Sequence, residues 1–148
     1  MDPILMGLIG LALAIGGPSL SAAFTISICG TALAGISTEK PELVSRLIIT
    51  VVLGEALAIY GLLIGFMILG KVPDITTVDS ASKALASGIV IAVATVSAGT
   101  GISYSGTSLI AATAEKPDSY SSNIISLVLS EALAIYGVLM AFMIIGLI

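Results

Sequence analysis

Four long stretches of apolar residues, nearly free of charged side chains, limit what this chain can fold into. They cover about residues 4–36, 43–70, 84–114 and 118–148. A helix that crosses a bilayer needs roughly 20 mostly apolar residues, and each stretch is at least that long. Hydrophobic residues make up 57% of the chain and charged residues 9%, far from the balance of a water-soluble domain. The sequence therefore predicts an all-α membrane protein with four transmembrane helices in the lipid bilayer.

The second and fourth stretches are copies of one another. Residues 55–70 read EALAIYGLLIGFMILG and residues 131–146 read EALAIYGVLMAFMIIG, with 12 of 16 positions identical at an offset of 76. The same offset aligns two polar Glu-Lys-Pro turns, at 39–41 and 115–117. A repeat of this length indicates a duplicated structural unit, which here is a helix, a polar turn and a second helix.

Two tandem hairpins follow from this repeat. The first is predicted over residues 1–70, a polar connector over 71–83, and the second hairpin over 84–148. Because each unit contains two spans, both copies enter the membrane the same way up, and the hairpins form a parallel repeat.

Residues that support several kinds of chemistry are missing. The chain has no histidine and a single cysteine, Cys29, which excludes imidazole metal sites, Cys–His pairs and an internal disulfide. No glycine-rich phosphate-binding motif follows a strand, and no basic patch is present for nucleic acid. We therefore expect no cofactor, no resident metal, no catalytic residues and no nucleic-acid partner.

Two glutamates lie deep in the apolar stretches. Glu55 follows the polar turn by about 12 residues, or about 18 Å of helix, and Glu131 is its copy in the second hairpin. An ionisable side chain near the bilayer centre costs roughly 2.5 to 3.5 kcal/mol on insertion scales, so such residues are usually functional. With no basic partner in helical reach, each is expected to be a neutral acid in lipid and to ionise when it meets water or a cation. We predict that both bind the transported ion.

Small residues recur along the first helix of each hairpin. Gly30, Gly99 and Gly106 belong to this series, which is predicted to let helix backbones approach closely in lipid. The second helices carry more Leu, Ile, Met and Phe and suit an outer layer. An ordinary four-helix bundle would use the same small residues.

The chain resembles the proteolipid subunit of V/A-type rotary ATPases. The resemblance rests on the tandem hairpins, the glycine-rich first helices, the Glu-Lys-Pro turns and the Glu-Ala-Leu-x-Ile-Tyr-Gly motifs. The likeness covers essentially the whole chain. It implies a homo-oligomeric two-layer ring that carries ions past an a/I-type stator subunit, with the polar turns on the central stalk. ATP hydrolysis would occur on other subunits, and the membrane would be a prokaryotic plasma membrane in preference to a eukaryotic endomembrane. Many duplicated relatives keep the acid in one hairpin, whereas this chain has it in both.

The residues around the acids favour protons over Na⁺, which remains the alternative. A sodium ion needs several oxygen ligands, but Ala and Leu follow each acid, and Ile26 and Ile102 stand where a glutamine is expected. If Na⁺ is the ion, its ligands would be the same two glutamates. Tyr60 and Tyr136 are predicted to support the ion sites. Each lies five residues, about 140° around the helix, from its own glutamate, so its hydroxyl is predicted to reach the glutamate of the adjoining hairpin.

Two other functions fit less of the sequence. A small proton-coupled multidrug transporter would also use four spans and a membrane glutamate, but it would need aromatic residues around its substrate, and the chain has no Trp and 5% aromatics. A structural scaffold would leave both glutamates unexplained.

Overall fold

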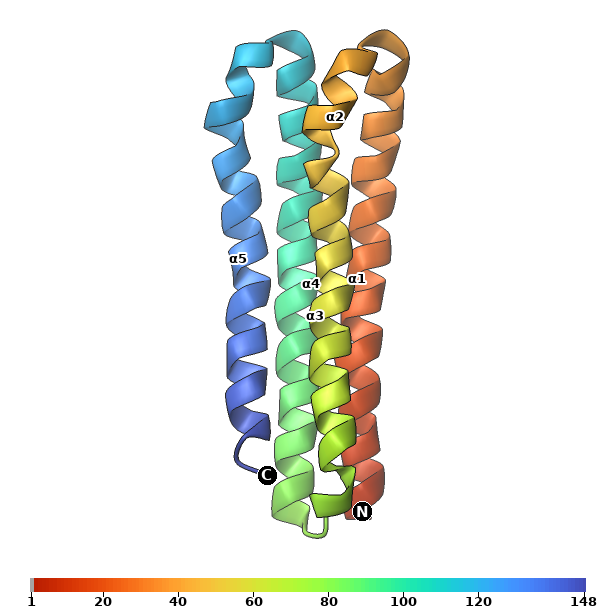
Figure 1. Ribbon diagram of the computed structural model, residues 1–148, viewed down its shortest axis with the longest axis vertical. Helices are drawn as coiled ribbons and strands as arrows, with labels where there is room; N and C mark the ends of the chain where they lie inside the picture. Colours follow the sequence, from red (N-terminus) through yellow and green to blue (C-terminus); the bar gives the residue numbers. More distant parts are fainter. Residues whose placement is uncertain (1) are drawn as a thin grey trace.

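The computed structural model describes residues 2–148 and is helical along nearly its whole length (Figure 1). The long helices are α1 (Pro3–Glu39), α3 (Ile49–Lys71), α4 (Val78–Glu115) and α5 (Tyr120–Ile145), and the short α2 (Val44–Leu47) leads into α3. Three 3₁₀ turns, at Pro41–Leu43, Val72–Asp74 and Pro117–Ser119, join them. Four helical segments are long and apolar enough to cross a membrane, which confirms the predicted fold class.

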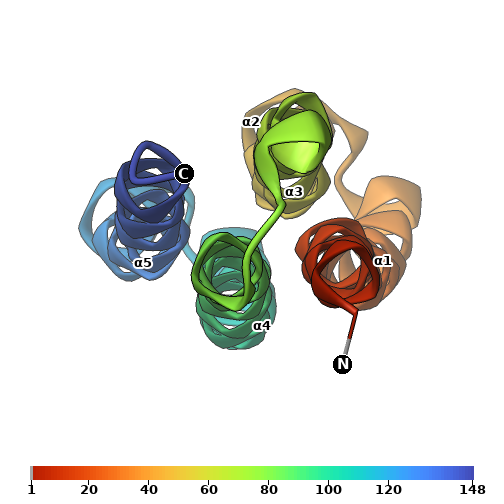
Figure 2. The same cartoon turned by 90° about the horizontal axis from the view of Figure 1, so that it is seen from below.

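The four helices form two layers. Seen along the helix axes, α1 and α4 lie side by side in one layer, and α3 and α5 lie in the other (Figure 2). The glycines explain the close approach of α1 and α4, since a side chain at Gly88 would overlap the carbonyl oxygen of Gly10. Buried hydroxyls add polar links between these two helices: Ser21 donates to the carbonyl of Thr95 (2.7 Å) and Thr25 to that of Gly99 (3.1 Å).

Helix α1 runs without a break through Pro18, where the sequence suggests an interruption at Gly16-Gly17-Pro18. A proline inside a helix removes one backbone hydrogen bond and usually kinks or breaks it. Here Pro18 is buried against Gly61 of α3, where an added side-chain carbon would lie 2.5 Å from the proline ring. Packing against α3 compensates for the local cost, so the helix continues.

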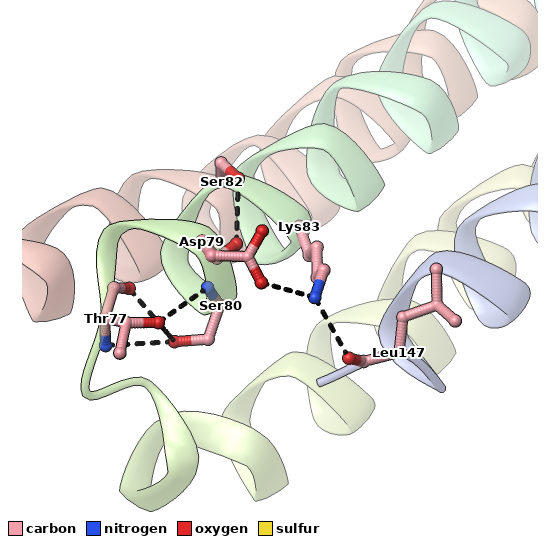
Figure 3. A network of polar contacts seen from close by, with 6 residues as sticks. All are labelled: Thr77, Asp79, Ser80, Ser82, Lys83 and Leu147. Atoms are coloured by element: carbon pink, nitrogen blue, oxygen red, sulfur yellow. Dashed lines mark hydrogen bonds and ion pairs between the residues drawn. The ribbon is translucent and has the colours of Figure 1, made fainter.

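Helix α4 begins at Val78, inside the segment predicted as a polar connector over 71–83. Its start is fixed by a capping box: Thr77 Oγ1 accepts from the Ser80 amide, and Ser80 Oγ accepts from the Thr77 amide, both at 3.2 Å (Figure 3). Such reciprocal bonds satisfy two amides that a helix start leaves free. One turn later, Lys83 contacts Asp79 at 2.5 Å and donates to the Leu147 carbonyl at 3.3 Å, which ties the end of the chain to α4.

Candidate functional site

Glu131 and Tyr60 meet about halfway along α5 and α3. The Tyr60 hydroxyl on α3 donates a hydrogen bond to Oε1 of Glu131 on α5. Both residues are half-buried, and the contact joins the first hairpin to the second. This is the partner that the helical spacing of Tyr60 predicts, since the tyrosine faces away from the glutamate of its own span.

Tyr60 packs against a cluster of buried apolar side chains. Leu57, Ile102 and Ala134 are fully buried in the cluster against which Tyr60 packs. Ile102, which stands where a glutamine is expected, is thus a buried hydrocarbon side chain of this cluster. Within residues 2–148, the Tyr60 hydroxyl is the one side-chain group that hydrogen-bonds to Glu131, and no group of three metal-ligating residues is present.

Four hydroxyl side chains of the spans, at Thr25, Ser27, Ser103 and Ser130, donate to backbone carbonyls and not to either glutamate. Ser130 donates to the carbonyl of Ser126 (2.8 Å), and Ser103 donates to that of Gly99 (2.7 Å). Ser27 likewise donates to the carbonyl of Ala23 at 2.7 Å, and Thr25 bonds to carbonyls of both α1 and α4. The side-chain groups that the described residues bring into hydrogen-bond contact here are one carboxyl group and one phenolic hydroxyl.

Glu55 and Tyr136 are not brought together. They are the counterparts of Glu131 and Tyr60 at the offset of 76 residues, but both are exposed, with Tyr136 61% exposed. Among the described residues, neither side chain has a hydrogen bond or ion pair. Glu55 lies on α3 of the first hairpin and Tyr136 on α5 of the second, and the described part of the single chain brings no partner to either.

The three glycines predicted to mediate helix packing differ in their surroundings. A side-chain carbon on Gly99 would overlap Ser21 Oγ and lie 2.9 Å from Thr25 Oγ1, and one on Gly106 would lie 2.8 Å from Cys29 Sγ. Both glycines therefore allow α1 and α4 to touch. At Gly30, the counterpart of Gly106, no atom of another helix among residues 2–148 lies within 4 Å of that position, so it faces open space in the single chain.

Sequence reasoning missed two contacts at the end that carries the Glu-Lys-Pro turns. The Lys40 ammonium donates to the carbonyl of Ala114, and the Arg46 guanidinium lies 3.9 Å from the ring centre of Tyr120. Both contacts join the two hairpins. The repeated lysine before each turn proline was the available signal, but it does not reveal which helix lies next to it.

Comparison with known proteins assigns the chain to a family. The family model for the C subunit of ATP synthase matches it twice, over residues 9–68 and 85–144, and the chain belongs to this family. The 16 kDa proteolipid of the rat V-type proton ATPase is 30% identical over 135 residues, covering 91% of this chain and 87% of the relative. The c′ subunit of the V-type proton ATPase of Candida glabrata is 32% identical over 137 residues, covering 91% and 84%. The chain is therefore a duplicated, multi-pass membrane proteolipid. These relatives are eukaryotic and lend no support to the expected prokaryotic membrane.

Proposed function

We propose that this chain is the ion-carrying subunit of a rotary ATPase rotor ring and that Glu55 and Glu131 carry protons across the membrane. The observation that carries the proposal is the hydrogen bond from Tyr60 to Glu131, because it crosses the boundary between two repeated hairpins. Membership of the ATP synthase C-subunit family and the named V-type proton ATPase relatives support it.

A second copy of the chain would complete the site at Glu55. If the next copy packs on this one as the second hairpin packs on the first, Tyr136 of one chain donates to Glu55 of its neighbour. The exposure of both side chains in the single chain agrees with such a contact. Open positions such as Gly30 on α1 would then receive α4 of the preceding copy. A closed ring formed in this way leaves no Tyr or Glu of the motif without a partner.

The chemistry of each site suits a proton. A carboxylic acid can accept the tyrosine hydroxyl hydrogen bond at its carbonyl oxygen while it holds its own proton, so the site is neutral in lipid. At the stator the acid would meet water or a cationic group and release the proton, because the charged form is costly in hydrocarbon and favourable beside an opposite charge. With both acids active, each chain carries two protons in a full turn.

Other subunits would complete the machine. We propose that an a/I-type stator subunit faces α3 and α5, the helices that bear the glutamates. The central-stalk subunit would bind the Glu-Lys-Pro turns, whose acids Glu39, Glu42, Glu115 and Asp118 are all exposed. With the three bases Lys40, Arg46 and Lys116, these four acids give this end a net charge of −1, and a basic stalk surface would complement the exposed acids. We retain a prokaryotic plasma membrane as part of the proposal, and fractionation of the source cells tests it.

Carbodiimide labelling tests the proposed sites and the ion together. Dicyclohexylcarbodiimide reacts with protonated carboxyls in apolar surroundings, so mass spectrometry of the treated ring should find the label on Glu55 and Glu131. Labelling should fall as pH rises and should be the same in NaCl and KCl at fixed pH and ionic strength. The sites offer too few oxygens to replace the water around Na⁺, which is why no protection by sodium is expected.

The exposed turn acids serve as internal controls for the labelling. Label confined to Glu39, Glu42, Glu115 or Asp118 would contradict the proposed sites. Selective protection by Na⁺ and not by K⁺ would replace the proton with sodium as the cargo. Protection of one glutamate alone would show that the two hairpins bind different ions.

A further inference from the structure

Lys40 links the ends of the two inner helices within one chain. It directly follows α1, and its ammonium donates to the carbonyl of Ala114 in the last turn of α4. The last carbonyls of a helix have no partner within the helix and carry its negative partial charge, so a lysine is a favourable partner for them. The contact therefore satisfies a carbonyl at the end of α4 and holds the two hairpins together.

Lys116 is the counterpart of Lys40 and emerges from the same local backbone. Its φ and ψ are −139° and 99°, against −137° and 67° for Lys40, and each amide bonds to the carbonyl four residues earlier, of Ala112 and Ile36 respectively. Each lysine is followed by a proline that starts a 3₁₀ turn. The Lys116 side chain is exposed, however, and its ammonium has no hydrogen bond or ion pair among the described residues.

A matching acceptor lies at the opposite edge of the chain. The residue equivalent to Ala114 in the first hairpin is Thr38, in the last turn of α1. Its side chain donates to the Gly35 carbonyl at 2.8 Å, whereas its own carbonyl accepts no hydrogen bond from residues 2–148. One chain thus carries an unused lysine donor at one edge and an unused carbonyl at the other, at the same end of the bundle.

We propose that the Lys116 ammonium of each chain donates to the Thr38 carbonyl of the next copy. This inference rests on the proposed ring, and it adds a polar contact that is separate from the ion sites. Lys40 and Lys116 would then alternate around the rim, each satisfying the end of the next inner helix.

The contact between two copies depends more on Lys116 than the contact between the two hairpins of one chain depends on Lys40. Within the chain, the Arg46–Tyr120 stacking contact and the covalent connector also join the hairpins. At the copy boundary the equivalents of Arg46 and Tyr120 are Ser122 and Val44, which form no such stack. Loss of Lys116 should therefore weaken the ring more than loss of Lys40.

Acetylation of the isolated ring tests the contact directly. After brief treatment with an amine-acetylating reagent, mass spectrometry compares Lys116 with Lys40 and with Lys71, which has only a 4.0 Å ion pair with Asp74. Lys116 should react as slowly as Lys40 and roughly tenfold more slowly than Lys71, a factor that corresponds to about 1.4 kcal/mol. Lys116→Met should lower the temperature at which the ring separates into chains, Lys116→Arg should restore it, and Lys40→Met should change it less.

Two results would contradict the proposal, and the experiment tells them apart. A ring in which Lys116 reacts as fast as Lys71, with Lys116→Met as stable as the unmodified ring, would overturn the contact while leaving the ring intact. Particles the size of one chain would overturn the proposed function, and this inference with it.

Discussion

Replacing Glu131 with glutamine is expected to abolish ion transport by the assembled complex. Glutamine has nearly the same size as glutamate, and its carbonyl oxygen can still accept the hydrogen bond from Tyr60, so α5 should pack unchanged. It cannot bind and release a proton. Proton uptake into vesicles, followed with a pH-sensitive dye, should fall to the level of vesicles without the complex.

The same loss is expected for Glu55→Gln, because every site must load and unload as it passes the stator. Asp74→Asn is the control: it removes an exposed carboxyl from the connector between the two hairpins, away from the Glu-Lys-Pro turns, and should leave transport intact. Transport at the unmodified rate in Glu131→Gln would contradict the proposed role of that residue. Unmodified transport in Glu55→Gln alone would restrict proton carriage to the second hairpin.

Leucine at Gly106 and at Gly30 should block assembly at two different stages. At Gly106 the first side-chain carbon would already lie 2.8 Å from Cys29 Sγ and 3.3 Å from Thr50 Cβ, so leucine would force α1 and α4 apart inside the chain. Overpacking of this kind typically costs about 1–3 kcal/mol. Gly106→Leu should therefore reduce the amount of folded chain that detergent extracts from the membrane.

Gly30→Leu should leave the single chain folded and prevent the ring, because among residues 2–148 no atom of another helix lies within 4 Å of the new carbon. Size-exclusion chromatography should then show particles of chain size in place of a large oligomer. Phe66→Leu and Phe142→Leu, at outer-layer positions that are 63% and 55% exposed, are the controls and should assemble normally. A full-sized ring from Gly30→Leu would show that α1 does not face another copy there.

Much of this fold could be predicted from the sequence because hydropathy and repetition report directly on it. The four apolar stretches predict four spans, and the offset of 76 residues predicts parallel hairpins. The partner of Tyr60 could be predicted too, since about 140° of helical rotation removes it from Glu55 and leaves the glutamate of the other hairpin. For Tyr136 the same reasoning leads to the Glu55 of a neighbouring copy, which lies outside the single chain.

What could not be predicted depends on contacts between segments distant in sequence. Pro18 is tolerated in α1 because Gly61 lets α3 pack against its ring, and local propensity contains no information about that neighbour. The stacking of Arg46 on Tyr120 depends on the lateral order of the hairpins, to which hydropathy is insensitive. The capping box of Thr77 and Ser80 was visible in the sequence as a threonine three residues before a serine, but serine in place of the usual Glu or Gln made the signal weak.

Electron microscopy of the purified, detergent-solubilised oligomer tests the central claim most directly. The account predicts a closed ring with α1 and α4 in the inner layer, α3 and α5 in the outer layer, and the Tyr136 hydroxyl of each chain bonded to Glu55 of the next. A particle of one or two chains, or a ring in which Glu55 faces the central opening, would contradict it.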